Sequence, residues 1–295
     1  MAKETVLIIG LGEIGHSLFM LLSEKQESFA VYGLDLDENK MCELSQNKDS
    51  VPSEVDNMQI CLPCGNPEKF SQVVTNYVAK YTPKIVIINS TVPPGTTLKV
   101  AEQCKCLVAH SPARGVHINP EHMVWEMKRW PKYIGGATSK AAEIAKEHFE
   151  KVGLIVKVLK SCRETELAKL FETTYRAWMI TCFQEMHRIS RAFGADFNET
   201  VDFLEDTHRQ RFDRPVMFPG FIGGHCLIPN TELLLKSYDS DFLRLILYSN
   251  EKRKEEMKDT TIKAEAEKIA ARVQALEKEL TGEKNITLPQ SEKTG

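Results

Sequence analysis

Short apolar runs alternate with polar stretches of helical length through the first half of the chain. Strands separated by such stretches predict crossover helices and a parallel sheet, because parallel strands need long connections. We therefore expect an α/β domain over residues 1–160. The runs with strand character are Thr5–Gly10, Phe29–Asp35, Met58–Leu62, Lys84–Ser90, Lys105–His110 and Leu154–Leu159.

The strand signals stop near Ser161, and the pattern that follows is helical. Glu164–Phe193 predicts one long helix, Phe197–Asp206 begins another, and the glycine-rich segment 218–224 leads to a third over Thr231–Asn250. We expect an all-helical domain over residues 161–250. Apolar residues spread widely around the long helix, which is typical of a helix buried between partners; they are Leu167, Leu170, Phe171, Trp178, Phe183 and Met186.

Residues 251–295 predict a charged helix followed by a flexible tail beyond Thr281. Within Lys252–Leu280 the apolar residues recur at steps of 4, 3, 4, 3 and 4, from Ile262 to Leu280. This heptad-like stripe is shorter than the three or four heptads that indicate a coiled coil. Docking onto the chain's own body and docking onto a partner both remain open.

Composition narrows the class of protein. The 295 residues favour two domains at roughly 150 residues each, and 38 basic against 41 acidic side chains give a net charge of −3. That balance argues against nucleic acid as a partner. No apolar run approaches the ~18 residues of a membrane span, so we expect no membrane segment. The first apolar run leads into glycines instead of a cleavage site, so we expect a cytoplasmic protein whose eight cysteines are reduced.

The first strand leads into Gly10-Leu11-Gly12-Glu13-Ile14-Gly15, a G-x-G-x-x-G motif that opens a helix. In this strand-to-helix context the motif predicts a Rossmann-type dinucleotide site, in which the turn and its backbone amides cradle a pyrophosphate. Asp35 follows Gly15 by 20 residues at the end of the second strand. Its carboxylate would accept hydrogen bonds from ribose hydroxyls and repel a 2′-phosphate, so NAD is favoured over NADP.

Two further segments carry candidate chemistry. The fourth strand ends in a hydroxyl-rich turn, where Ser90 and Thr91 either donate to a ligand at the carboxyl edge of the sheet or form an ordinary ST-turn. In Gly223-Gly224-His225-Cys226 the thiol is either a nucleophile or an inert loop cysteine. Lys169 on the long helix, three residues after Glu166, looks like a solvated charge.

Two cysteine pairs, Cys61 with Cys64 and Cys104 with Cys106, raise the question of a metal. No histidine stands at ligand spacing beside either pair. We therefore expect no metal site.

Together these motifs resemble the UDP-glucose/GDP-mannose dehydrogenase family of nucleotide-sugar 6-dehydrogenases. The resemblance runs over most of residues 4–249 and keeps the family's order. Besides the glycine motif and Asp35 it covers Ile60–Pro63, the turn 90–97, His110-Ser111-Pro112-Ala113-Arg114, Tyr133–Gly136, the helix segment 166–176 and Pro219–Pro229.

The resemblance implies oxidation of a primary alcohol to a carboxylate by two hydride transfers to NAD. It assigns Cys226 as the nucleophile that traps the aldehyde and Lys169 as the cation that stabilises charge on the substrate oxygen. Thr91 would lie near the reacting centre, and Pro63 and Ser90 would join the cofactor site. It also implies a homodimer formed through the 164–193 helix.

Three positions depart from the family pattern. A glutamate used in the hydrolytic half-reaction is Ala113 here, an asparagine after the lysine is Thr173, and an aspartate after the cysteine is Asn230. Loss of a general acid or base typically costs ~10²–10⁴ in rate. We also expect the chain to lack the family's C-terminal nucleotide-sugar-binding domain.

The sequence therefore predicts an NAD-dependent dehydrogenase acting on a sugar or sugar nucleotide. Two alternatives stay open. One is a two-electron dehydrogenase of the β-hydroxyacid type, in which Cys226 is dispensable. The other is a catalytically impaired NAD-binding scaffold protein.

Overall fold

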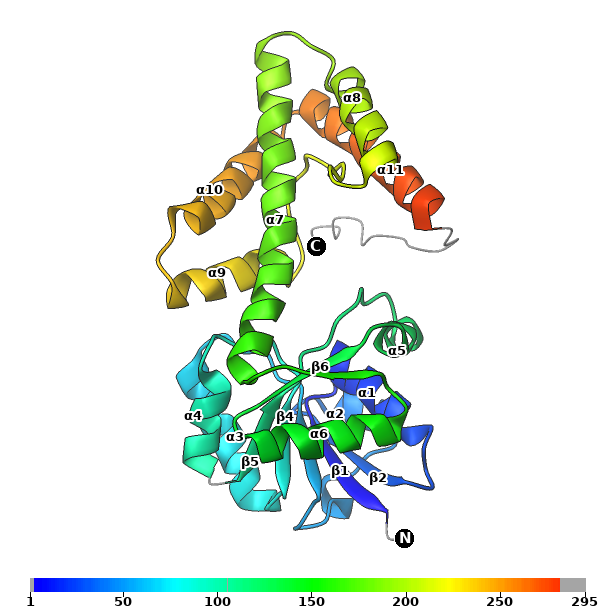
Figure 1. Ribbon diagram of the computed structural model, residues 1–295, viewed down its shortest axis with the longest axis vertical. Helices are drawn as coiled ribbons and strands as arrows, with labels where there is room; N and C mark the ends of the chain where they lie inside the picture. Colours follow the sequence, from blue (N-terminus) through cyan, green and yellow to red (C-terminus); the bar gives the residue numbers. More distant parts are fainter. Residues whose placement is uncertain (1–2, 105, 282–295) are drawn as a thin grey trace. The chain divides into compact units, whose positions relative to one another are not determined.

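The computed structural model describes residues 3–104 and 106–281. The chain divides into two compact units, Met1–Lys169 and Leu170–Gly295, and the division falls inside one long helix, α7 (Cys162–Ala192) (Figure 1). The expected domain limits at residues 160 and 250 stay predictions, and the tail expected beyond Thr281 lies outside the described residues. Nowhere in the described ranges is a helix long and apolar enough to cross a membrane.

The first unit is built on one sheet, whose strands follow the order β2-β1-β3-β4-β5-β6-β7. The predicted α/β fold is confirmed, and the first five strands run parallel. Their bounds are β1 (Glu4–Ile9), β2 (Phe29–Leu34), β3 (Asn57–Ile60), β4 (Ile85–Ile88), β5 (Leu107–His110), β6 (Lys132–Gly136) and β7 (Val156–Val158).

The order in which strands are added to the sheet reverses at β1. β1 pairs with β2 on one side and with β3 on the other, so the connection after β2 returns past β1. Ile9 lies opposite both Leu34 and Ile60, which brings the carboxyl ends of these three strands level. Ligands of open α/β sheets bind outside the strand ends at such a switch point.

Strand β6 was not predicted, and it runs antiparallel to β5. Its sequence, Lys132–Gly136, is short and ends in two glycines, so it lacks the β-branched run that marks the other strands. The expectation of a sheet made only from the six apolar runs was therefore wrong at this edge.

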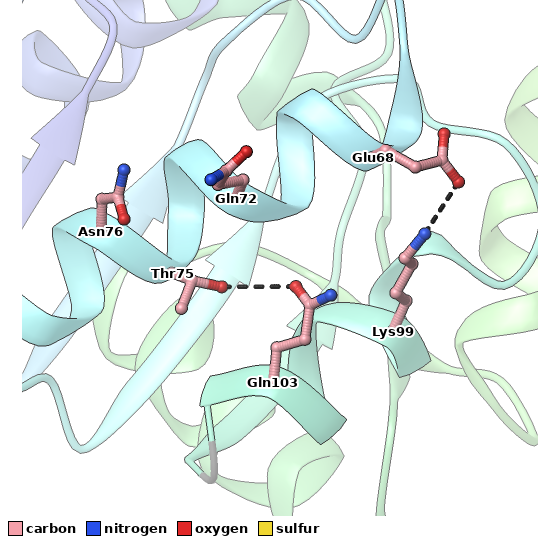
Figure 2. Close-up of a pocket in the computed structure, with 6 residues that line it drawn as sticks. All are labelled: Glu68, Gln72, Thr75, Asn76, Lys99 and Gln103. Atoms are coloured by element: carbon pink, nitrogen blue, oxygen red, sulfur yellow. Dashed lines mark hydrogen bonds and ion pairs between the residues drawn. The ribbon is translucent and has the colours of Figure 1, made fainter.

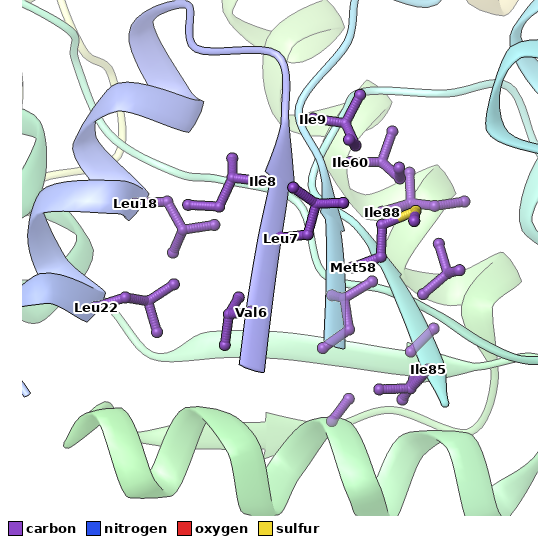
Figure 3. Packing of buried hydrophobic residues seen from close by; sticks show 14 of the residues in the cluster. Val6, Leu7, Ile8, Ile9, Leu18, Leu22, Met58, Ile60, Ile85 and Ile88 are labelled. Atoms are coloured by element: carbon purple, nitrogen blue, oxygen red, sulfur yellow. The ribbon is translucent and has the colours of Figure 1, made fainter. Parts of the chain in front are cut away.

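Helices cover both faces of the sheet (Figure 1). Right-handed crossovers place α1 and α3 on opposite faces. Val6 and Ile8 of β1 pack toward Leu18 and Leu22 of α1 in a core from which water is excluded (Figure 3). Each such side chain contributes about 1.5–3 kcal/mol on burial. The helices of this unit are α1 (Glu13–Ser23), α2 (Glu38–Glu43), α3 (Pro67–Tyr81), α4 (Thr96–Cys104), α5 (Pro120–Arg129) and α6 (Ser139–Val152), with a 3₁₀ turn at Lys48–Ser50.

The described part of the second unit is helical, as predicted, but its helices differ from the expected ones. The single helix expected over Thr231–Asn250 is two helices that break at Tyr238, whose backbone is extended. Ser240 is the N-cap residue of the next helix, although its side chain forms no cap hydrogen bond, and Asp241 occupies the first turn. A serine followed by an acid is typical of a helix start, which the apolar periodicity alone did not reveal. The helices are the rest of α7, α8 (Phe197–Arg211), α9 (Leu227–Ser237), α10 (Asp241–Glu256) and α11 (Thr260–Thr281).

The charged helix expected from Lys252 begins only at Thr260, and it docks on its own chain. α11 packs against α8, and Arg272 pairs with Asp202 and Glu205 of that helix. Its buried stripe is Ala266, Ile269, Val273 and Leu276. Of the two docking modes left open by the sequence, docking on the chain's own body is observed.

Candidate active site

The glycine motif joins β1 to α1 at the switch point. Gly12 is the N-cap residue of α1, in an extended conformation and without a side-chain cap on the first N–H groups. A Cβ placed on Gly12 would meet nothing within 4 Å, whereas one on Gly15 would lie 1.7 Å from the carbonyl oxygen of Gly10. The turn is therefore tightly packed at Gly15 and open at Gly12, where an anion can approach the helix N-terminus.

Asp35 follows β2 and is bonded directly to this turn. One carboxylate oxygen accepts the N–H of Leu11 at 2.7 Å, and the other accepts the N–H of Asp37 at 2.9 Å. The Lys40 ammonium lies 3.9 Å away. An acid beside an open glycine turn is the donor and acceptor set that a dinucleotide requires, so these residues fit NAD.

The two residues between the second and third glycines lie in the first turn of α1. Ile14 is half-buried and packs against the core. The Glu13 carboxylate is exposed, 3.5 Å from Nδ1 of His117. A cofactor at this turn would therefore meet the backbone of Glu13 and not a bare carboxylate.

The remaining predicted cofactor residues line the same carboxyl edge. Pro63 lies in the loop after β3, and Ser90 follows β4 as a buried residue whose hydroxyl donates to the carbonyl oxygen of Ile60 at 3.3 Å. Thr91 is half-buried beside it. The ends of β3 and β4 thus carry these three residues to one rim.

A buried lysine that the sequence did not single out joins the ends of β4 and β5. Nζ of Lys132 donates to Oδ1 of Asn89 at 2.9 Å and to the carbonyl oxygen of Ser111 at 2.7 Å. Within the described residues, Lys132 forms no ion pair. Burial, with a smaller contribution from the charge of Lys169, lowers the pKa of Lys132 to about 7, although Cys61 opposes the shift.

His110, at the end of β5, is neutral. Burial, with smaller contributions from the charges of Lys132 and Lys169, lowers the pKa of His110 to about 3. Nε2 lies 3.0 Å from the carbonyl oxygen of Ser90 and must donate, because a carbonyl only accepts. Nδ1 lies 2.8 Å from the Thr165 hydroxyl. Lys169, half-buried on α7, therefore shares this edge with a second lysine and a neutral histidine.

Glu166 is a buried acid that the sequence did not single out. Its side chain is fully buried, and its carboxylate accepts the N–H groups of Gly95 and Thr97. In residue type and in spacing along the sequence, Glu166 looks like an exposed charged residue of a helix, and Lys132 looks like one of a strand. Only the tertiary packing identifies them.

The predicted nucleophile belongs to the second unit. Cys226 is exposed and is the N-cap residue of α9, two residues after Gly224 of the glycine pair. One turn later, Nδ2 of Asn230 donates to Oγ1 of Thr173 at 3.3 Å, and both residues are buried. Two of the positions that depart from the family pattern are thus partners of each other.

A polar hollow of about 410 Å³ lies between α3 and α4, away from these residues (Figure 2). Glu68 and Lys99 form an ion pair of 2.7 Å at one end, and the Thr75 hydroxyl donates to Gln103 at 3.4 Å. No predicted site residue lines it, so it adds nothing to the candidate site. Its lining is Glu68, Gln72, Thr75, Asn76, Lys99 and Gln103.

Comparison with known proteins gives consistent matches. Residues 163–252 match the central domain of the UDP-glucose/GDP-mannose dehydrogenase family. A UDP-N-acetyl-D-mannosamine dehydrogenase of Methanocaldococcus jannaschii is 28% identical over 260 residues, covering 75% of this chain and 59% of the relative. The chain spans less than two thirds of the length of the first curated relatives it matches.

Solved structures share the fold. The UDP-D-ManNAc dehydrogenase of Pyrococcus horikoshii superposes with a TM-score of 0.70 at 21% identity, over 84% of this chain and 68% of that one. A 3-hydroxyisobutyrate dehydrogenase of Mycobacterium tuberculosis gives a TM-score of 0.64 at 15% identity, over 88% and 95%. At these identities the likeness concerns the fold alone. The central-domain match and the sequence relatives support the UDP-glucose/GDP-mannose dehydrogenase family, the nucleotide-sugar dehydrogenases, as the family that this chain resembles.

Proposed function

We propose that this chain carries out NAD-dependent oxidation of an alcohol on a sugar-like substrate, with a sugar nucleotide as the leading substrate class. The observation that carries the proposal is the uncapped, open N-terminus of α1 at the switch point, with Asp35 bonded to the same turn. Sequence similarity supports the reaction type, since the curated relatives bear the names of nucleotide-sugar dehydrogenases.

NAD bound at this site would supply the hydride acceptor. The backbone from Gly10 to Gly15 would hold the pyrophosphate, and Asp35 would accept hydrogen bonds from the ribose hydroxyls. Pro63, Ser90 and Thr91 would border the nicotinamide at the ends of β3 and β4. The carboxylate of Asp35 disfavours a 2′-phosphate, so NAD is proposed over NADP.

Lys169 would stabilise the negative charge that develops on the substrate oxygen as the alcohol proton leaves to water, before hydride passes from its carbon to NAD. The thiolate of Cys226 would then add to the aldehyde carbon, giving a thiohemiacetal after the oxygen is protonated. Once a second NAD had replaced the NADH, loss of a second hydride to it, with the hydroxyl proton leaving to water, would leave a thioester. Water would cleave the carbon–sulfur bond, releasing the carboxylate and restoring the thiol. The N-cap position of Cys226 favours an anion there, because the helix dipole is positive at that end. This chemistry requires a reduced thiol, so we place the protein in the cytoplasm.

A two-electron reaction that stops at the carbonyl compound is the second candidate. It is favoured by the lost carboxylates: Ala113 carries no acid, and Asn230 is bonded to Thr173 instead of presenting a base. Without a general base, thioester hydrolysis would slow by about 10²–10⁴. In this case Cys226 is dispensable and each substrate yields a single NADH.

We also propose a homodimer that forms through α7. A stripe of exposed apolar residues lies along one side of this helix in two groups, one in its first half and one near its end, although Leu170 and Phe183 on other sides are buried. Phe171 and Met186, expected to be buried, are 56% and 40% exposed and belong to this stripe. Its exposed members on the helix are Phe171, Tyr175, Met186 and Ile189, and Phe193 follows directly after the helix ends.

Calorimetry with NAD and NADP, followed by NADH formation on a panel of sugar nucleotides, sugars and hydroxy acids, tests the proposal. We expect NAD to bind more tightly than NADP. Gly12→Val should weaken NAD binding at least tenfold without lowering the melting temperature, because the space beside Gly12 is open. No heat with NAD, or an unaffected Gly12→Val variant, would contradict the cofactor site.

Cys226→Ser separates the candidates. If the four-electron reaction operates, NADH falls from two per substrate to one or fewer in this variant. An unchanged yield of one NADH supports the two-electron reaction instead. NAD binding without NADH from any alcohol would favour the scaffold alternative.

A further inference from the structure

The first turns of α7 bury two polar side chains that the proposed chemistry does not use. Thr165 is 1% exposed and Glu166 is 0% exposed. Burying a carboxylate is costly unless hydrogen bonds replace the lost water. What these side chains bind is therefore informative.

Glu166 holds the far end of the hydroxyl-rich turn. Its two oxygens accept the N–H of Gly95 at 2.7 Å and the N–H of Thr97 at 2.8 Å. These N–H groups lie at the start of α4, so a carboxylate from α7 caps this helix from outside its own sequence. Burial raises the pKa of Glu166, and these hydrogen bonds oppose the rise.

Thr165 reaches the near end of the same turn through His110. The Thr165 hydroxyl lies 2.8 Å from Nδ1 of His110, whose Nε2 lies 3.0 Å from the carbonyl oxygen of Ser90. Because the pKa of His110 is lowered to about 3, this link stays uncharged at ordinary pH. Adjacent residues of α7 thus hold both ends of the turn 90–97, which carries Thr91.

A close backbone approach accompanies these two links. A Cβ on Gly135 of β6 would lie 2.2 Å from the carbonyl oxygen of Ser161 and 2.6 Å from Cα of Cys162. Glycine at this position lets the start of α7 rest directly on the sheet. The beginning of the helix is therefore fixed by packing as well as by hydrogen bonds.

We propose that Thr165 and Glu166 are positioning residues that set Lys169 relative to Thr91, an inference that rests on the proposed function. Lys169 follows them by four and three residues, so all three lie on one side of the helix. The charge of Lys169 acts on both His110 and Lys132 at the same edge. The contacts of residues 165 and 166 with the turn 90–97 therefore fix the position of the Lys169 backbone relative to that turn.

Displacing a catalytic group by about 1 Å can cost roughly 10²-fold in rate. The glycine turn and Asp35 bind neither Thr165 nor Glu166 in the described contacts. Weakening the contacts that join Thr165 and Glu166 to the turn 90–97 should therefore lower kcat while leaving NAD affinity intact. A merely structural role would lower the melting temperature without this selective effect.

Glu166→Gln and Glu164→Gln make a matched pair for the test. Both lie in the first turns of α7, but Glu164 is exposed and bonds only the nearby Ser161 hydroxyl. In Glu166→Gln the amide NH₂ faces one of the two backbone N–H donors, so one hydrogen bond is lost. We expect kcat to fall about 10- to 100-fold with NAD affinity within twofold of wild type, and no change in the control.

Thr165→Val and Thr165→Ser extend the test if the buried Gln weakens folding. Valine keeps the shape of threonine and removes the hydroxyl, whereas serine retains the hydroxyl. We expect kcat to fall in Thr165→Val and to recover in Thr165→Ser. Wild-type kcat in both Glu166→Gln and Thr165→Val would overturn the proposal.

Two activity-independent measurements separate this inference from the proposed function. Amide exchange at Gly95 and Thr97, and acetylation of Lys169 by acetic anhydride followed by mass spectrometry, require no substrate. Faster exchange and an altered acetylation rate in Glu166→Gln, but not in Glu164→Gln, support the positioning role of Glu166 even if the wild-type protein forms no NADH. Unchanged values in both variants refute this role, whatever the activity.

Discussion

Two lysines lie at the carboxyl edge of the sheet, and they differ in how deeply they are buried. Lys169 is half-buried on α7, while Lys132 is buried and hydrogen-bonded only to an amide and a carbonyl oxygen. A buried ammonium without a carboxylate loses its hydration and gains no Coulomb partner in return. Burial therefore lowers the pKa of Lys132 from an ordinary 10.5 to about 7.

Lys132→Met should flatten part of the pH dependence of stability. The pKa of Lys132 is about 7 in the folded protein against an ordinary 10.5, so between these values the unfolded chain binds more protons. The free energy of unfolding should then rise with pH over this window, by at most about 1.4 kcal/mol per pH unit. Urea unfolding at pH 7, 8 and 9 measures the slope. Lys140→Met, at an exposed lysine of α6, should keep the wild-type slope; equal slopes in both variants would refute the assignment.

At the scale of elements, a buried polar cluster ties β1 to α6. Oε1 of Glu4 lies 2.6 Å from Nδ1 of His148, and Oε2 accepts from Lys151 at 2.9 Å. Nε2 of His148 continues to Gln59 of β3 at 3.1 Å. The cluster joins two strands to the helix that covers them.

Acid should weaken this tie. Burial raises the pKa of Glu4, but the hydrogen bonds and charges of His148 and Lys151 outweigh it and bring the pKa to about 2. The stabilisation is complete above about pH 4.5 and is lost as pH falls toward 2, a loss of about 1–3 kcal/mol. Glu4→Gln should remove this acid-dependent component in urea titrations from pH 5 to pH 3. Glu143→Gln, at an exposed glutamate of α6, should retain it, and a wild-type acid profile in Glu4→Gln would exclude the cluster as its source.

Elements were predictable where local pattern and tertiary role agree. The strand, glycine turn and helix from Thr5 to Gly15 carry every required signal within the segment, so the motif placed them correctly. Strand β6 has no such local signal, and it forms because β5 offers an open edge. Lys132 and Glu166 could not be separated from surface charges, since their burial depends on strands and helices distant in sequence.

At the scale of the whole molecule, each unit is stabilised differently. The first unit buries a continuous apolar core between sheet and helices. The second also buries polar groups, among them Arg253, which lies 3.0 Å from Nδ1 of His187 and donates to the carbonyl oxygen of Gln184. In the second unit a row of large apolar side chains on α7 remains outside the core, and its surface area requires an explanation.

A second copy of the same helix is the occupant that this row fits best, because a stripe along one helix is self-complementary across a two-fold axis. Sedimentation velocity should give wild type twice the chain mass of 33.4 kDa at micromolar concentration. Tyr175→Glu combined with Ile189→Glu places two charges in the stripe and should yield a monomer, since buried unpaired charges oppose association. Phe203→Glu alters a still more exposed aromatic residue on α8, outside the stripe, and should remain a dimer. A monomeric wild type, or dissociation by Phe203→Glu alone, would show that α7 is not the interface.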